Sequence, residues 1–192
     1  MFYYQDLVLE ESELVYPPSE DSILLAERVD VTPGECVLDL GCGCGLIGIL
    51  AAKRGAHVVC ADINPYALEL TKRNAERNGV RVTLVLSDLF SNLKDMVFDK
   101  IFFNPPYVPC EEEITEPIEL SWNGGDDGNR VIERFLREFP EYLRDGGSAF
   151  IILSSMNNPE HLMEKYKNIH FELLTRIHMF FEDIMVYRLV VG

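Results

Sequence analysis

The sequence lacks a hydrophobic run long enough to cross a membrane. Its clearest candidate, the uncharged run from Cys42 to Ala52, falls well short of the ~20 apolar residues that a transmembrane helix needs. The opening residues, MFYYQDLVLEE, are acidic, whereas a secretory signal peptide begins with a basic segment. Internal repeats and low-complexity tracts are also missing. These absences argue against a membrane protein, a secreted precursor and a repeat array, so we expect a cytoplasmic protein.

A cysteine pattern typical of secreted domains is also missing. The number of cysteines is odd, and most of them lie in apolar runs: Cys36, Cys42, Cys44, Cys60 and Cys110. A disulfide framework is therefore not expected. Cys42 and Cys44 have neither a second cysteine pair nor a histidine cluster at metal-ligand spacing. We predict reduced cysteines and no metal site.

Basic residues are absent from two segments. Residues 1–27 contain seven acidic residues and residues 101–129 contain seven more, without a lysine or arginine in either segment. The rest of the chain carries 18 acids and 17 bases. Because Lys and Arg bind nucleic-acid backbones, acidic segments beside an active site would disfavour DNA or RNA and favour a protein partner with a basic surface. The alternative is that both segments are only solvated loops.

The size and the residue pattern favour one α/β domain. The 192 residues are 47% hydrophobic, and domains span roughly 100 to 200 residues, so we expect a single domain over 1–192. Short apolar runs alternate with longer amphipathic ones, as in strand–helix–strand units. This pattern predicts strands at 36–40, 57–62, 82–86, 98–103 and 149–153, and helices at 46–53, 65–78, 129–143 and 159–167.

Both ends of the chain add elements to this core. Two β-like runs joined near Glu182 predict a C-terminal hairpin, which completes a doubly wound, mostly parallel seven-stranded sheet with one antiparallel strand. Ahead of the sheet, residues 6–16 are predicted to form a small hairpin, and Ser19 to cap a helix over 20–29.

A glycine-rich turn follows the first predicted strand of the sheet. Gly41, Gly43 and Gly45 lie where doubly wound sheets bind ligands, and glycine lets backbone N–H groups approach a ligand closely. Gly43, Gly45 and Gly48 also match G-x-G-x-x-G, with Asp62 19 residues after Gly43. This second match is typical of dinucleotide-binding proteins.

Acidic residues near three successive strand ends discriminate between the two cofactors. Asp39 would repel a pyrophosphate, but it suits S-adenosylmethionine, which has no phosphate and carries an ammonium and a sulfonium group. Asp62 can accept hydrogen bonds from both ribose hydroxyls, and Asp88 can accept one from the adenine amino group. We therefore predict S-adenosylmethionine, with NAD as the alternative. Asp62 as a helix-start acid and Asp88 as a loop cap are the structural alternatives.

The segment Asn104-Pro105-Pro106-Tyr107 ends the fourth predicted strand. The two prolines fix the backbone and favour an extended Asn104. The carbonyl groups of Asn104 and Pro105 can then accept both hydrogens of a planar NH2 group, on which the Tyr107 ring can stack. Holding both N–H bonds favours pyramidalisation of the nitrogen, so positioning and electrostatics would promote transfer without a dedicated general base. A rigid loop without a catalytic role is the alternative.

Together these motifs resemble class I S-adenosylmethionine-dependent methyltransferases, and among them the HemK-like protein glutamine N5-methyltransferases. The resemblance covers about residues 14–154 and includes YPPSEDS (16–22) and SWNGGDDG (121–128). It implies a Rossmann-like fold, residues 1–30 as a cover of the cofactor site, and the Gly-Gly-Gln loop of a translation release factor as the substrate. Asn104, Pro105, Pro106 and Tyr107 would hold the glutamine. The predicted cofactor contacts are Ser22, Asp39, Gly41, Gly43, Gly45, Asp62, Asp88, Leu89 and Asn104.

The chain resembles the short archaeal and eukaryotic branch, because it lacks the helical N-terminal domain of bacterial members. That branch uses a small zinc-binding activator subunit, which adds to the sheet edge. Residues 80–86 would form this edge and carry few charges and no proline, the usual guards of an exposed edge. The alternative is that the chain covers the edge itself.

The competing function is a nucleic-acid adenine-N6 methyltransferase, which shares the NPPY motif. Such an enzyme must flip a base into its pocket and hold phosphates with cations, yet the loop after NPPY reads EEEITEPIE. Nucleic-acid binding is therefore not expected.

Overall fold

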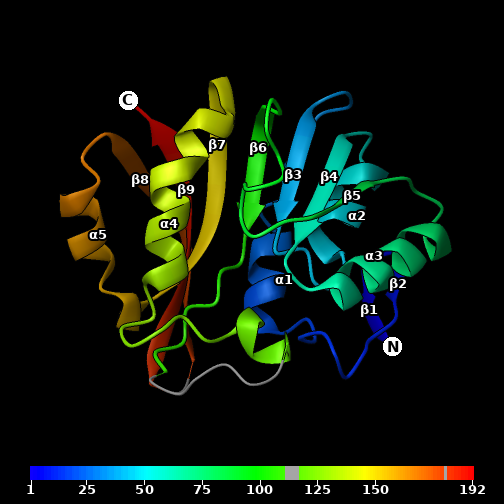
Figure 1. Ribbon diagram of the computed structural model, residues 1–192, viewed down its shortest axis with the longest axis horizontal. Helices are drawn as coiled ribbons and strands as arrows, with labels where there is room; N and C mark the ends of the chain where they lie inside the picture. Colours follow the sequence, from blue (N-terminus) through cyan, green and yellow to red (C-terminus); the bar gives the residue numbers. More distant parts are fainter. Residues whose placement is uncertain (111–116, 180) are drawn as a thin grey trace.

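The computed structural model describes residues 1–110, 117–179 and 181–192. Its centre is a seven-stranded sheet in the order β5-β4-β3-β6-β7-β9-β8 (Figure 1). β9 runs antiparallel to both of its neighbours, and the other neighbouring strands pair in parallel. The strands are Cys36–Leu40 (β3), His57–Asp62 (β4), Thr83–Leu86 (β5), Phe98–Phe103 (β6), Leu143–Ser154 (β7), Ile169–Met179 (β8) and Glu182–Val191 (β9). The predicted fold class is confirmed, including the single antiparallel strand.

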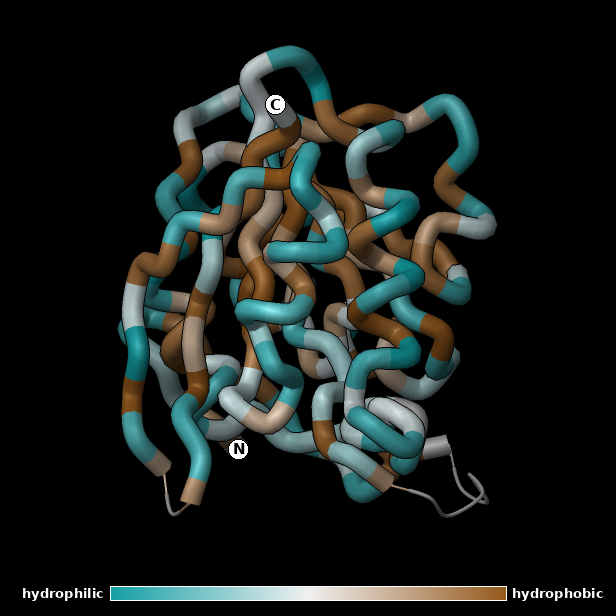
Figure 2. Tube along the Cα trace, turned by 90° about the vertical axis from the view of Figure 1, so that its left-hand side faces the viewer, coloured by the Kyte–Doolittle hydropathy of each residue, from teal (hydrophilic) through white to brown (hydrophobic). Residues whose placement is uncertain are grey.

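Helices cover both faces of this sheet (Figure 1). Buried side chains of α1 (Glu20–Ala26), α2 (Leu46–Lys53) and α3 (Pro65–Arg77) form one hydrophobic core with the sheet. Those of α4 (Arg130–Glu138) and α5 (Pro159–Lys165) form a second core. Figure 2 shows the apolar residues gathered inside, along the strands. None of the helices in the described part of the chain is long and apolar enough to cross a membrane.

Within the described part of the chain, three short 3-10 helices connect these elements: η1 (Pro117–Ser121), η2 (Phe139–Tyr142) and η3 (Ser155–Asn157). The strands β3, β4 and β6 and the helix α2 have the predicted bounds. The helix predicted to reach residue 143 ends instead at Glu138, because Pro140 has no N–H group to continue it. β7 begins earlier than predicted, with Gly146 inside it at a φ of +78°.

The predicted hairpin at residues 6–16 is wrong. The hairpin is formed by Phe2–Tyr4 (β1) and Leu7–Leu9 (β2), which pair antiparallel. Leu7 and Leu9 alternate into the core and are buried, whereas the acidic residues that follow them have no apolar face to bury. The burial of Leu7 and Leu9 therefore determines which residues pair in the hairpin.

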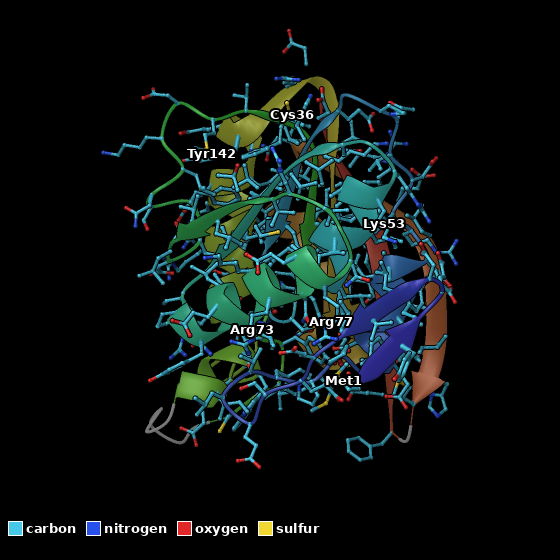
Figure 3. All side chains as sticks on the ribbon, turned by 90° about the vertical axis from the view of Figure 1, so that its right-hand side faces the viewer. Met1, Cys36, Lys53, Arg73, Arg77 and Tyr142 are labelled. Carbon is cyan, nitrogen blue, oxygen red and sulfur yellow. The ribbon has the colours of Figure 1, made fainter. Side chains whose placement is uncertain are left out.

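Helix α3 holds the hairpin in place. Asn78 exchanges hydrogen bonds of 3.0 and 2.9 Å with the backbone of Val8. Asn74 accepts a hydrogen bond from the backbone N–H of Glu10 at 2.6 Å, and Arg73 and Arg77, labelled in Figure 3, pair with the Glu10 carboxylate. These contacts satisfy backbone groups that a lone two-stranded hairpin would leave exposed.

Candidate active site

A cavity of about 320 Å³ lies at the carboxyl ends of β3, β4, β5 and β6. Nine of the twelve predicted site residues line it: Ser22, Asp39, Gly41, Gly43, Asp62, Asp88, Leu89, Asn104 and Pro106. Gly45, Pro105 and Tyr107 are not among the lining residues. The volume is that of a small-molecule site, and its position is the one where open α/β sheets bind ligands.

Two polar residues of α3 fix the glycine turn. Thr71 Oγ1 donates to the carbonyl of Gly43 at 3.0 Å, and Asn74 Nδ2 donates to the carbonyl of Cys44 at 2.9 Å. Gly45 has a φ of +86°, and a Cβ there would lie 2.9 Å from Thr71 Cγ2. Gly45 therefore shapes the turn from outside the cavity. The sequence analysis missed Thr71 and Asn74, although polar residues three apart on the buried face of a helix are a usable signal.

Two buried aspartates lie beside this turn. Asp39 accepts a hydrogen bond of 2.8 Å from the backbone N–H of Gly48. Asp62 accepts from the N–H groups of Gly43 at 2.9 Å and Asn64 at 2.8 Å. Burial raises the pKa of Asp39 to about 7 and also raises the pKa of Asp62, although the backbone hydrogen bonds oppose both shifts. Because ionised carboxylates are costly here without a countercharge, the pocket favours a cationic ligand over a pyrophosphate.

Asp88 forms an ion pair at the pocket wall. The two terminal guanidinium nitrogens of Arg134 each donate to one Asp88 carboxylate oxygen, both at 3.1 Å. Arg134 and Arg130 belong to α4 and line the cavity, and neither was predicted. Each Asp88 oxygen keeps a lone pair, so the carboxylate can still accept a hydrogen bond from a ligand. Leu89 is buried and has a φ of +47°.

Asn104 directly follows β6. Its Nδ2 donates to Asp21 Oδ2 at 3.0 Å, and the Tyr107 hydroxyl donates to the same oxygen at 3.0 Å. Among the described residues, the buried Oδ1 of Asn104 has no hydrogen-bond partner. Burial, and then the negative charge of Asp21, raise the pKa of Tyr107, so its hydroxyl stays protonated as a donor.

Asp21 was not predicted as a site residue. It is only 5% exposed, and its contact with Asn104 joins residues 83 positions apart. In the sequence, an acid in the first turn of a helix indicates interaction with the helix dipole and nothing more. Only its place in the YPPSEDS segment pointed toward the site.

The predicted SWNGGDDG segment packs on the loop that follows Asn104. The backbone of Val108 accepts from Gly124 at 2.9 Å and donates to the carbonyl of Trp122 at 3.0 Å. Gly128 has a φ of +73°, and a Cβ there would lie 2.4 Å from the carbonyl oxygen of Tyr107. The glycines of this segment therefore permit close backbone packing against the NPPY loop.

Comparisons with known proteins agree with this geometry. Residues 19–176 match the family model described as "Methyltransferase small domain". A protein of Methanocaldococcus jannaschii named for protein N5-glutamine methyltransferase activity is 42% identical over 177 residues, which are 90% of this chain and 89% of that protein. Methyltransferase HEMK2 of Mus musculus is 36% identical over 166 residues, 80% of this chain and 78% of that protein. The chain belongs to the HemK-like class I methyltransferases.

A solved methyltransferase structure also resembles this chain in sequence and fold. The E. cuniculi Mtq2-Trm112 complex, described as responsible for methylation of the eRF1 translation termination factor, contains a chain of 26% identity and a TM-score of 0.73. The match covers 93% of this chain and 99% of that chain. The predicted family and fold are therefore both confirmed.

Proposed function

We propose that this chain transfers a methyl group from S-adenosylmethionine to the side-chain amide nitrogen of a glutamine, in the Gly-Gly-Gln loop of a translation release factor. The observation that carries the proposal is the buried Oδ1 of Asn104, which has no hydrogen-bond partner among the described residues and belongs to a residue that lines the same cavity as the glycine turn. The names of the relatives, N5-glutamine methyltransferase and the eRF1-methylating complex, supply the substrate class.

The cavity residues fit the cofactor. The acidic pair Asp39 and Asp62 suits its ammonium group and its ribose hydroxyls, and the free lone pairs of Asp88 suit the adenine amino group. When bound, S-adenosylmethionine supplies an electrophilic methyl group on a sulfonium. Asp39, buried at the end of β3 beside the glycine turn, would repel the pyrophosphate of NAD, so we set the dinucleotide alternative aside.

The NPPY segment positions the acceptor amide. Asn104 Oδ1 and the carbonyl of Pro105 accept its two hydrogens, which holds the nitrogen in the orientation needed for attack. The amide proton becomes acidic only once the nitrogen carries the new methyl group, so the chain needs no general base beforehand. Oriented oxygens beside a developing positive charge supply electrostatic stabilisation.

Charge around the cavity favours a basic protein substrate over a nucleic acid. The exposed residues Glu20 and Asp126 belong to the two acidic segments, and Ser22 and Ser121 of these segments line the cavity. Of the cavity arginines, Arg134 is already paired with Asp88. Four further acids of the second segment, Glu111, Glu112, Glu113 and Glu116, lie outside the described residues.

One experiment separates these functions. The enzyme is incubated with radiolabelled S-adenosylmethionine and either a release factor, its Gln-to-Asn variant in the Gly-Gly-Gln loop, or adenine-containing DNA. We expect label on the unsubstituted factor alone. Label on DNA alone would support the adenine methyltransferase, and calorimetric binding of NADH without binding of S-adenosylmethionine would support the dinucleotide alternative.

We also propose a small zinc-binding partner subunit at the β5 edge. β5 is an end strand of the sheet, and its Leu86 is 51% exposed. The Mtq2-Trm112 structure shows that a similar chain forms a complex with a second protein. Leu86→Lys should weaken co-purification with a candidate subunit. Leu173→Lys is the matched control, because Leu173 is 48% exposed on the opposite end strand β8; equal effects would contradict this placement.

The N-terminal segment contributes to the wall of the proposed cofactor site. Val15, Tyr16 and Pro18 line the cavity, which supports residues 1–30 as a cover of the cofactor site within one domain spanning 1–192. A release factor as substrate would place the reaction in the cytoplasm.

A further inference from the structure

Asp21 is a buried carboxylate that the proposed reaction does not yet use. It accepts five hydrogen bonds. Its Oδ1 accepts from the backbone N–H of Ser22 at 2.6 Å, from the Ser22 hydroxyl at 3.2 Å and from the Ser19 hydroxyl. Its Oδ2 accepts from Asn104 Nδ2 and the Tyr107 hydroxyl, both at 3.0 Å. All of these donors converge on a group that only accepts.

This arrangement determines which end of the Asn104 amide faces Asp21. The two ends of an asparagine amide have nearly the same shape but opposite hydrogen-bonding roles. The opposite orientation would place Asn104 Oδ1 against Asp21 Oδ2, so two acceptors would face each other in a buried site. The NH2 end therefore faces Asp21, and the oxygen is left without a partner among the described residues.

We propose that Asp21 is a positioning residue that holds the Asn104 side-chain amide in the orientation that offers its oxygen to the substrate amide. The inference rests on the proposed function, which makes Asn104 Oδ1 an acceptor for the glutamine NH2 group. With the amide reversed, an NH2 group would meet another NH2 group and the substrate hydrogens would lose an acceptor.

Tyr107 strengthens the arrangement. Its hydroxyl occupies a second acceptor position on the same Asp21 oxygen. The raised pKa of Tyr107 keeps the hydroxyl protonated, so it acts as a donor toward Asp21. The aspartate thereby also connects α1 to both ends of the NPPY segment.

The first test is Asp21→Asn. The backbone N–H of Ser22 cannot rotate, so the oxygen of the new amide stays on that side. Its NH2 group then faces Asn104 and Tyr107. The Asn104 amide must reverse, and we expect kcat for glutamine methylation to fall about 100-fold. The Kd of S-adenosylmethionine should change by less than about threefold, because the substituted group orients the acceptor and not the cofactor. A kcat within about twofold of the unsubstituted enzyme would overturn the proposal.

The second test is the reciprocal exchange Asp21→Asn with Asn104→Asp. The amide at position 21 would now donate to one carboxylate oxygen at position 104, and the other oxygen would again face the substrate. We expect the double variant to exceed Asp21→Asn in kcat by about tenfold or more, a non-additive recovery that marks direct coupling. A double variant no faster than the slower single variant would contradict the proposal, because a merely structural role predicts accumulated damage.

A measurement on the unsubstituted chain covers the case in which Asp21→Asn fails to fold. In protein labelled with 15N-asparagine, the Asn104 side-chain signals are identified by their loss in Asn104→Ala. We expect these NH2 protons to exchange with water slowly; exchange as fast as that of exposed asparagines would refute the orientation. If the unsubstituted enzyme does not methylate glutamine, the proposed function is wrong. If Asp21→Asn methylates glutamine at the normal rate, only the proposed role of Asp21 is wrong.

Discussion

The side-chain amide of Asn157 donates a hydrogen bond of 2.9 Å to the backbone carbonyl of Tyr107. The same nitrogen lies 3.3 Å from the carbonyl of Gly128, to which it also donates. Asn157 is fully buried, so these bonds are shielded from water. The NPPY loop is thus fixed by the Asn157 side chain of η3 and by backbone hydrogen bonds with the 121–128 segment.

Gly128→Ala should disturb this loop. The added Cβ would lie 2.4 Å from the Tyr107 carbonyl oxygen, at a φ of +73°. We expect the free energy of unfolding to fall by about 2 kcal/mol or more and kcat to fall about tenfold or more, because the loop must move. Denaturant titration and turnover measure the two effects.

Gly146→Ala is the matched control for Gly128→Ala. Gly146 has a φ of +78°, but a Cβ there would meet nothing within 4 Å. This substitution should cost about 1 kcal/mol of stability and leave kcat unchanged. Equal losses of kcat in the two variants would mean that contact with the NPPY loop does not matter.

Asn104→Ala should separate binding from transfer. Removal of the side chain would take away one proposed acceptor of the substrate amide, so kcat should fall about 100-fold or more. Most of the cavity is left intact, so the Kd of S-adenosylmethionine should change by less than about threefold. Calorimetry and turnover measure the two quantities, and unchanged turnover would remove Asn104 from its proposed role.

Asp39 should make stability depend on pH. Burial raises its pKa to about 7 in the folded chain, whereas the pKa of an unfolded aspartate is ~3.9. The folded state then binds more protons, so this contribution to the free energy of unfolding is fully present below about pH 4 and is lost as the pH rises through about 7. Asp39→Asn should flatten the dependence measured by urea titration at several pH values. Part of the pH dependence of stability should remain in Asp39→Asn, because the pKa of Asp62 is also raised.

The same carboxylate should make cofactor binding depend on pH in the opposite direction. In the proposed complex, ionised Asp39 would attract the ammonium group of S-adenosylmethionine, so affinity should increase as the pH rises through the Asp39 pKa of about 7. Binding near neutral pH should release protons, which calorimetry in buffers of different ionisation enthalpy detects. Proton release that persists unchanged in Asp39→Asn would assign the effect to another group.

Asp88→Asn should affect binding more than folding. The Asp88–Arg134 pair is exposed, with the Asp88 side chain 48% accessible, so its loss should cost less than about 1 kcal/mol of stability. Loss of the proposed hydrogen bond to the adenine amino group should raise the Kd of S-adenosylmethionine about tenfold. Glu172→Gln is the control, because Glu172 pairs with Arg188 at 49% side-chain exposure in the sheet edge strand β8. A similar rise in Kd for both variants would contradict a contact at Asp88.

Much of the cofactor side of the site could be predicted from the sequence. Buried parallel strands produce continuous apolar runs, and their carboxyl ends meet at one edge of the sheet. Asp39, Asp62 and Asp88 occur in or just after three such runs, so their convergence follows from topology once the strands are assigned.

The contacts supplied by helices could not be predicted in the same way. Asp21 reaches Asn104 across 83 positions, and Asp88 meets Arg134 across 46. Both contacts depend on how α1 and α4 pack, which hydrophobic periodicity does not specify. The three-residue strands β1 and β2 are too short for alternation to distinguish them from a loop. The end of α4, in contrast, could have been predicted from the sequence. Pro140 indicates a helix end, but the predicted boundary at residue 143 does not take it into account.

The buried amide of Asn74 has a practical consequence for protein engineering. It contacts both Glu10, which follows the N-terminal hairpin, and Cys44 in the glycine turn. An affinity tag or deletion that displaces the hairpin would thus also disturb the glycine turn, because Asn74 bonds both. The resulting loss of activity would resemble a catalytic defect. Purification handles are better fused after Gly192, which is exposed.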